Sequence, residues 1–290
     1  MSRLFEALRQ SELQGTPREP VGLEDVSSVL STDLLNRIEG EGLGLEQVRS
    51  VPLRIPSENG VVALTDEYGV AAEKFRLLAI RLRNLQQARN LKIILVTSSV
   101  MQEGKSLISA NLAVALATRE KQKVLLIEGD LRQPRLGKIL GTGRSPGLSE
   151  WSEQNRPISD YLCRLGQLPL WLLPAGQAGH KPLEILHTPR LAEALKQLPA
   201  WFDTILIDSP PVVQLTDANV WEELSDGTLL IVREGKTPKK MLEKALENLD
   251  KKKLIGAVLN EATISNQNYY KYGSHEAAGK NAHPTEKEPL

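Results

Sequence analysis

Five short aliphatic runs constrain the fold of this chain more than any other feature of its sequence. They cover residues 91–96, 123–127, 204–207, 228–232 and 254–259. Each run is nearly continuous, as strands that are buried on both faces require. Helical patterns lie before and between the runs, at about 66–87, 105–120, 189–198, 217–224 and 238–250. This alternation predicts an α/β fold with a doubly wound, mostly parallel sheet flanked by helices, and a ligand at the carboxyl ends of the strands.

The two ends of the chain lack this pattern. Residues 3–13 place Leu4, Ala7 and Leu8 on one face of a short amphipathic helix, with a frayed terminus as the alternative. Residues 14–59 have the composition of a linker, with one candidate helix at 31–38. After Asn260 the chain has no Val or Phe and a single Leu, too little apolar surface to offset the entropy of ordering. We therefore expect flexible extensions at 1–60 and 263–290 around an ordered domain at 61–262.

Charge and cysteine usage exclude several classes of protein. Lys and Arg total 36 and so do Asp and Glu, so no net field draws the chain to nucleic acid or an anionic membrane. The single cysteine, Cys163, cannot form a disulfide within the chain, which favours a reducing compartment. The first residues lack the apolar centre of a signal peptide. The most apolar stretch, residues 107–117, is shorter than the roughly 20 residues that span a bilayer. We expect a cytoplasmic protein with neither nucleic-acid binding nor a transmembrane segment of its own.

A phosphate-binding loop is predicted where the first strand ends. The sequence TSSVMQEGKS (97–106) follows that strand and leads directly into a helix. Backbone N–H groups of such a loop cradle the α- and β-phosphates of a nucleotide. Lys105 would reach the β- and γ-phosphates, and the Ser106 hydroxyl would bind Mg²⁺. Ser99 stands where the consensus has Gly, and an ordinary helix start is the alternative. The predicted nucleotide-binding residues here are Ser99, Gln102, Glu103, Gly104, Lys105, Ser106 and Leu107.

Acidic side chains follow two further strands. Glu128 and Asp130 end the second strand, where the period of two should point both carboxylates to the same side. Asp208 ends the third strand, which two prolines then terminate, as in a Walker B site. Carboxylates beside a triphosphate can hold Mg²⁺, and one can accept the proton of an attacking hydroxyl. The alternatives are that Asp130 caps a turn, that Glu128 is a solvated charge and that Asp208 is a loop residue. The predicted catalytic residues are thus Lys105, Glu128, Asp130 and Asp208, with Ser106, Asp130 and Asp208 around the metal.

Tyrosines cluster in the tail. The chain has five, and three of them, Tyr269, Tyr270 and Tyr272, fall in the segment predicted to be disordered. Core packing cannot explain tyrosines in such a segment. A flexible tail can carry its hydroxyls to the active site of its own or a neighbouring subunit, where phosphorylation adds about −1.5 to −2 charge per site. The alternative is an aromatic patch that docks on the domain.

Together, residues from about 64 to 272 resemble the P-loop tyrosine kinases of bacteria (BY-kinases) that accompany capsule and exopolysaccharide assembly. The resemblance rests on TSSVMQEGKS (97–106) as Walker A, IEGDLRQP (127–134) as Walker A′, ILIDSPPV (205–212) as Walker B and the NYYKYG tail (268–273). It implies a P-loop NTPase-like fold, a kinase domain at 61–262, and ATP and Mg²⁺ as cofactors. It further implies transfer of the γ-phosphate to the tail tyrosines, with Asp130 assisting the tyrosine hydroxyl and Asn260 touching the adenine.

The resemblance also implies partners. A membrane-bound polysaccharide co-polymerase would act as activator and hold the kinase at the inner membrane. Subunits would associate, in relatives as rings, through a helix motif that survives here as Glu73 and Arg76 but ends in Ala79 instead of Arg. Relatives usually have Asp in place of Glu128, and Pro and Gly in place of Met101 and Gln102.

Two other functions remain open on the sequence alone. A ParA/MinD-like positioning ATPase shares the sheet, but its signature lysine is replaced by Val100. A catalytically weak scaffold that binds ATP and regulates polysaccharide export is suggested by Glu128 and Ala79.

Overall fold

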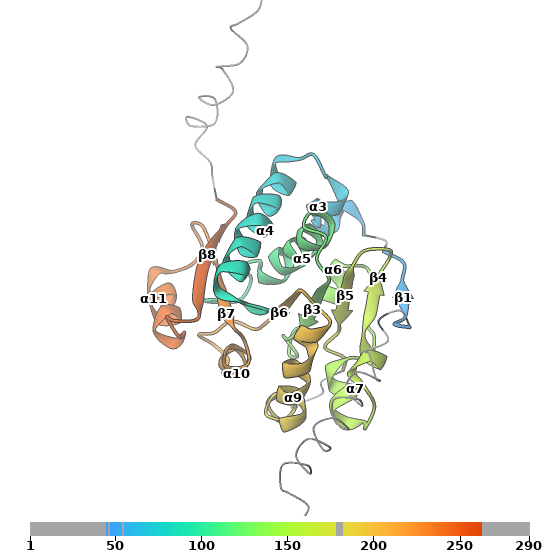
Figure 1. Cartoon of the computed structure of the whole chain (residues 1–290). Helices are drawn as coiled ribbons and strands as arrows, with labels where there is room; N and C mark the ends of the chain where they lie inside the picture. The colour runs from blue at the N-terminus through green and yellow to red at the C-terminus, as the bar shows by residue number, and fades with distance from the viewer. Residues whose placement is uncertain (1–44, 46, 54, 178–181, 263–290) are drawn as a thin grey trace, which may run out of the picture. The chain divides into compact units, whose positions relative to one another are not determined.

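An eight-stranded sheet forms the centre of the computed structural model, which describes residues 45, 47–53, 55–177 and 182–262 (Figure 1). The strands are β1 (Ser50–Val51), β2 (Ile93–Ser98), β3 (Val124–Glu128), β4 (Cys163–Leu165), β5 (Leu170–Leu173), β6 (Thr204–Asp208), β7 (Gly227–Arg233) and β8 (Leu254–Asn260). Their order is β1-β4-β5-β3-β6-β2-β7-β8. Every neighbouring pair is parallel except β4 and β5. The mostly parallel sheet predicted from the sequence is confirmed.

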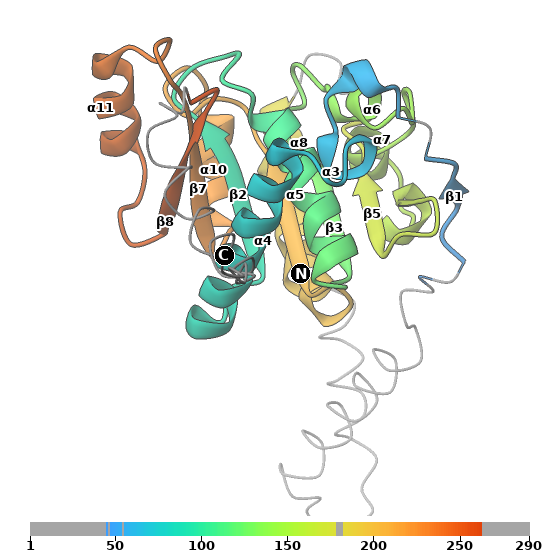
Figure 2. The same cartoon turned by 90° about the horizontal axis from the view of Figure 1, so that it is seen from above.

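Helices cover both faces of this sheet. They are α3 (Val62–Thr65), α4 (Val70–Arg89), α5 (Lys105–Arg119), α6 (Leu136–Ile139), α7 (Leu148–Glu153), α8 (Pro182–Leu186), α9 (Pro189–Gln197), α10 (Asp217–Glu223) and α11 (Lys239–Asn248). Short 3-10 turns are η1 (Ser57–Asn59), η2 (Ile158–Tyr161) and η3 (Leu198–Ala200). Figure 1 shows α4 and α5 on one face and α9 and α10 on the other. Figure 2 shows β8 and α11 at one edge of the sheet and β1 at the opposite edge. Within the described residues, no helix is long and apolar enough to cross a membrane.

The long elements form where hydrophobic periodicity predicts them, with small shifts at their ends. The first expected strand, 91–96, is found as β2 two residues later. The shift has a local cause: the Leu91 N–H is bonded to the carbonyl of Gln86 at the end of α4. The backbone N–H groups of Lys92 and Ile93 both donate to the Asp226 carboxylate at 2.8 Å. These bonds fix the chain between helix and strand before the ladder begins.

Three short strands were not predicted. β4 and β5 form an antiparallel hairpin that reverses after Leu165, where Gly166 has a φ of 57°. β1 lies within the stretch expected to be a linker and pairs in parallel with β4. Strands of two to four residues are too short to show a period, and each forms on the edge of a neighbour: β5 on β3, β4 on β5 and β1 on β4.

The core continues directly beneath the carboxyl ends of the strands. Ile94 and Val96 of β2 pack into one apolar cluster with α4 and α5, because alternate strand residues point to one face. On the other face Trp221 of α10 is fully buried, and its indole N–H donates to the Gly129 carbonyl at 3.0 Å. A β-carbon at Gly129 would lie 2.9 Å from atoms of both Trp221 and Ile207. Packing therefore fixes the backbone between Glu128 and Asp130.

The predictions for the two ends of the chain lie outside the described residues. They include the N-terminal helix and most of the linker, together with the tail tyrosines Tyr269, Tyr270 and Tyr272.

Candidate active site

The predicted phosphate-binding loop lies between β2 and α5. It contains two residues in the left-handed region, Gln102 with φ of 65° and Gly104 with φ of 90°, and α5 begins at Lys105. Such left-handed turns before a helix direct successive N–H groups to one side and form an anion-binding concavity. Gln102 is a non-glycine residue in this conformation, which costs about 1 kcal/mol. The surrounding structure must offset that cost.

Lys105 and Asp130 form a buried ion pair at the mouth of this loop. The Lys105 Nζ lies 3.2 Å from Oδ2 of Asp130, and both side chains are at most one-tenth exposed. The other oxygen of Asp130 accepts a hydrogen bond from the backbone N–H of Gln133 at 3.0 Å. Asp130 therefore caps a turn and also faces the P-loop lysine, so both interpretations drawn from the sequence describe the same carboxylate.

Asp208 lies beside this pair with an open coordination position. It ends β6, is only 1 % exposed and receives hydrogen bonds from the hydroxyls of Ser106 and Ser109. Its buried Oδ2 has no hydrogen-bond partner. Burial raises the pKa of Asp208 to about 7, while the nearby Lys105 ammonium acts in the opposite direction. A buried carboxylate oxygen without a partner is suited to a cation.

The donor set at Asp208 fits Mg²⁺. Mg²⁺ is usually held by one or two protein carboxylates together with substrate phosphates and water. Among the described residues there is no group of three or more His, Cys, Asp or Glu side chains that could form an all-protein metal cage. The Ser106 hydroxyl and Asp208, with Asp130 close by, would hold the ion together with a nucleotide.

Glu128 ends β3 and lies opposite Asp208 of β6 in the sheet. Its Oε1 accepts a hydrogen bond from the Leu136 N–H at 2.6 Å, and its Oε2 accepts one from the Ala175 N–H at 3.1 Å. The side chain is 4 % exposed, so it is not a solvated charge either. Burial raises the pKa of Glu128, and the backbone hydrogen bonds oppose this shift. Both oxygens are thus used to tie the end of β3 to the start of α6 and to Ala175, two residues after β5.

Glu128→Ala is expected to lower the free energy of unfolding by about 2 kcal/mol or more, because it leaves two buried backbone N–H groups unpaired. Denaturant unfolding followed by circular dichroism would measure the change. Glu150→Ala is the matched control, because Glu150 also accepts from two backbone N–H groups, those of Gly147 and Gln177, but is only half-buried. Water can replace its carboxylate, so the loss should be smaller. An equal loss in the two variants would contradict the structural role of Glu128.

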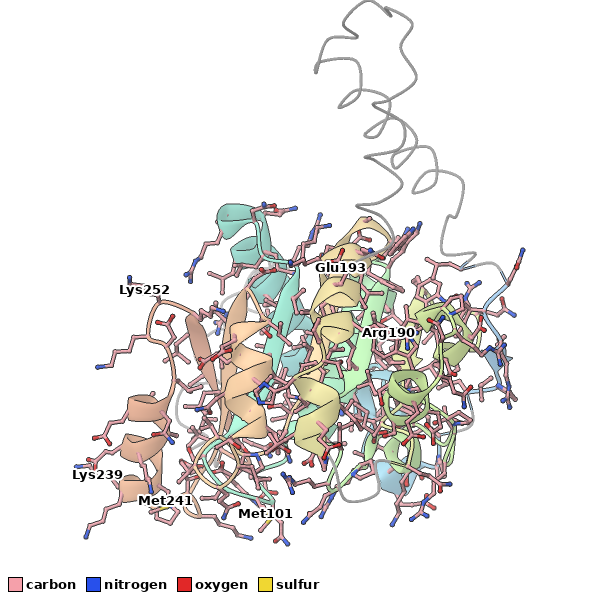
Figure 3. The ribbon with its side chains drawn as sticks, turned by 90° about the horizontal axis from the view of Figure 1, so that it is seen from below. Met101, Arg190, Glu193, Lys239, Met241 and Lys252 are labelled. Atoms are coloured by element: carbon pink, nitrogen blue, oxygen red, sulfur yellow. The ribbon has the colours of Figure 1, made fainter. Side chains whose placement is uncertain are left out.

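Several residues at the site were missed by sequence reasoning. A cavity of about 350 Å³ next to Lys105 and Ser106 is also lined by Gln133, Arg135 and Arg233. Met101, on the loop beside this cavity, is 48 % exposed and lies at the edge of the molecule (Figure 3). Arg132 makes a bidentate ion pair with the buried Asp217, at 2.8 and 3.1 Å, which links the segment after β3 to the start of α10. The sequence offered one signal for these two arginines: Arg135 comes a few residues after the end of β3, and Arg233 is the last residue of β7.

The remaining predicted residues lie outside the Lys105–Asp130–Asp208 cluster. The Asn260 side chain donates to the Glu103 carbonyl at 2.9 Å, so it contacts the outer side of the loop. Asn260 also lines a groove of about 470 Å³ between α4 and β8. Glu73 and Arg76 form an ion pair with each other on the exposed part of α4. Ala79, three residues further on, is fully buried and belongs to the core.

The site combines a fixed ammonium with the amino end of a helix. A phosphate at the mouth of the loop would meet the Lys105 ammonium and the positive end of the α5 dipole, which is how P-loop proteins hold nucleotide phosphates. The acidic end of β6 lies next to it, one strand away from the loop. The fold and the site place the chain in the class of P-loop nucleotide-binding proteins.

Comparison with known proteins narrows this class. No protein-family model matches the chain. The chain is 30 % identical over 217 residues to the tyrosine-protein kinase YwqD of Bacillus subtilis (strain 168), which covers 74 % of this chain and 91 % of that protein. It is 32 % identical over 204 residues to the putative tyrosine-protein kinase CapB of Staphylococcus aureus, covering 69 % of this chain and 89 % of that protein. The chain belongs to this family of bacterial tyrosine-protein kinases.

Two further comparisons extend this result. The succinoglycan biosynthesis transport protein ExoP of Rhizobium meliloti (strain 1021) is 30 % identical over 219 residues, which are 73 % of this chain but 27 % of that protein. Among solved structures, the chimerical protein CapA2B2 aligns with a TM-score of 0.67 and 25 % identity, over 78 % of this chain and 99 % of that one. The predicted family and fold are confirmed.

Proposed function

We propose that this protein is an ATP-dependent tyrosine autokinase that transfers the γ-phosphate of ATP to Tyr269, Tyr270 and Tyr272 of its own tail. The observation that carries the proposal is the buried pair of Lys105 and Asp130, 3.2 Å apart, next to the unpartnered oxygen of Asp208. A phosphate-binding cation thus lies beside a carboxylate that can accept a proton.

Each residue has a defined part in this proposal. The N–H groups of the loop and the Lys105 ammonium bind and orient the triphosphate. The tyrosine hydroxyl oxygen bonds to the γ-phosphorus, and its proton passes to the Asp130 carboxylate. The bond from that phosphorus to the bridging oxygen breaks, and ADP leaves. Ser106 and Asp208 would hold Mg²⁺, which neutralises charge on the phosphates when bound.

The cellular setting is also part of the proposal. The similarity to a succinoglycan biosynthesis transport protein supports a role in exopolysaccharide or capsule synthesis or export. We place the protein in the cytoplasm, at the inner membrane through a membrane-bound co-polymerase that activates it, with self-association through the exposed face that carries Glu73 and Arg76. The adenine would lie near Asn260, where the groove between α4 and β8 offers the apolar side chains of Phe75, Leu78 and Ile108.

The alternatives from the sequence have less support. A ParA/MinD-like ATPase would need a lysine at position 100, where this chain has valine. A weak scaffold was suggested by the replacement of Asp with Glu128. That longer side chain has a packing role of its own, so it is no sign of a degraded active site.

Incubating the full chain with Mg-ATP and mapping phosphate by mass spectrometry tests the proposal. We expect phosphate on the tail tyrosines and loss of nearly all of it when Tyr269, Tyr270 and Tyr272 are replaced with Phe. Tyr68→Phe is the matched control, since Tyr68 is 95 % exposed yet lies outside the tail. ATP hydrolysis without any phosphotyrosine would favour the positioning ATPase. Phosphate that persists in the triple variant would contradict the tail as the substrate.

A further inference from the structure

The outer side of the phosphate-binding loop is held by side chains from β7 and β8, the two strands between β2 and the nearer edge of the sheet. Arg233, at the end of β7, donates from Nη1 to the Gln102 carbonyl at 3.0 Å. The same guanidinium pairs with Glu261, just after β8, at 2.6 Å from Nε and 2.5 Å from Nη2. Arg233 thus connects the loop to the residue at which the chain leaves the last strand.

A second set of contacts fixes the next peptide unit. The Glu103 carbonyl accepts from the Asn260 side chain, and its carboxylate bonds to the Thr237 hydroxyl and to the Val100 N–H. The Thr237 hydroxyl in turn accepts a hydrogen bond from the backbone N–H of Arg233 at 2.9 Å. Glu103 is 2 % exposed, so these bonds are shielded from water. The carbonyls of two consecutive loop residues, Gln102 and Glu103, are therefore both turned toward the β7–β8 edge.

The direction of these carbonyls sets the direction of the N–H groups that follow. In a trans peptide the C=O and N–H point opposite ways. When Arg233 holds the Gln102 carbonyl outward, the Glu103 N–H points away from Arg233. Gln102 has a φ of 65°, which L-residues rarely adopt, so its peptide needs an external partner to keep this orientation. Relatives with glycine at that position would need no such support.

We propose that Arg233 is a positioning residue for ATP, which holds the Gln102–Glu103 peptide in the orientation that presents its N–H to the phosphates. Glu261 fixes the guanidinium for this task. The inference rests on the proposed function, because it takes the loop to be the ATP site. Arg233 also borders the cavity next to Lys105, so a direct charge contact with a phosphate is the competing explanation.

A substitution cycle on the full chain separates these explanations, with ATP affinity measured by isothermal titration calorimetry in Mg²⁺. Arg233→Ala is expected to weaken ATP binding about tenfold, the usual effect of losing a hydrogen bond from a charged donor. Gln102→Gly alone should bind at least as tightly as wild type, because glycine adopts positive φ without strain. In the double variant Arg233→Ala/Gln102→Gly, most of the lost affinity should return.

The control and the contrary outcomes are well defined. Arg89→Ala removes another arginine that donates to a backbone carbonyl, that of Lys252 at 2.9 Å, and should leave ATP affinity unchanged. Equal affinity of Arg233→Ala and wild type, or a loss that Gln102→Gly does not restore, would overturn the positioning role. Absence of ATP binding in wild type would overturn the proposed function instead. Thermal melting of each variant shows whether it is folded.

Discussion

Lys105→Met is expected to abolish tail phosphorylation while the protein stays folded. The ammonium of Lys105 is the cation that faces both Asp130 and the phosphate-binding loop, and methionine keeps most of the side chain's length without the charge. Removing a preorganised charge of this kind costs about a hundredfold or more in rate. The measurement is phosphotyrosine formation from radiolabelled ATP, compared at equal protein concentration.

The matched control is Lys239→Met. Lys239 is the first residue of α11, is 89 % exposed at its side chain and extends away from the sheet (Figure 3). This variant should label as fast as wild type. If Lys105→Met also labelled at the wild-type rate, the loop would not be the site of phosphate transfer, and the proposed mechanism would have to be abandoned.

Asp208→Asn is expected to have opposite effects on activity and stability. Activity should fall about a hundredfold, because the carboxylate that would hold Mg²⁺ is lost. Stability without nucleotide should rise near neutral pH, because burial raises the pKa of Asp208 from 3.8 to about 7. The folded state then binds the proton more tightly than the unfolded state, so stability falls as the pH rises between these two values. Asparagine does not titrate and removes this loss.

Denaturant unfolding at pH 5 and pH 8, without Mg²⁺ or ATP, measures the effect. The gain of Asp208→Asn over wild type should be larger at pH 8 than at pH 5. Asp203→Asn is the control: Asp203 lies just before the same strand, is exposed and accepts from the Lys123 N–H at 2.8 Å, a bond that asparagine can keep. If Asp208→Asn were less stable than wild type at pH 8, the charge on Asp208 would not be a cost to the fold.

The strands that carry the site could be predicted because they are long, continuous and apolar. Asp208 ends such a strand, Asp130 comes two residues after one, and Lys105 begins the helix that follows the loop after another, so the parallel arrangement brings them to one edge of the sheet. The direction of Glu128 could not be predicted in this way. It depends on the backbone N–H groups of Leu136 and Ala175, which only the folded chain brings to it. A period of two predicts the side of a strand, but it does not say whether a carboxylate faces a ligand or the protein's own amides.

The role of Arg233 was hidden for a similar reason. Its partner is a backbone carbonyl 131 residues earlier in the chain, and a carbonyl leaves no mark in the sequence. The short strands β1 and β4 were missed because they need an existing edge to pair with. Local sequence patterns thus predicted the strands that are buried on both faces of the sheet. They missed the contacts that form only when distant parts of the chain come together in the fold.

The close packing of Trp221 against Gly129 restricts how this site can evolve. No side chain fits at position 129 while the indole lies beneath it, and the indole N–H has its acceptor in the carbonyl of that same glycine. A change at either position therefore requires a compensating change at the other, and related genes should inherit the two residues as a pair. The backbone between the acids at 128 and 130 thus depends on a tryptophan that lies 92 positions after the glycine in the chain.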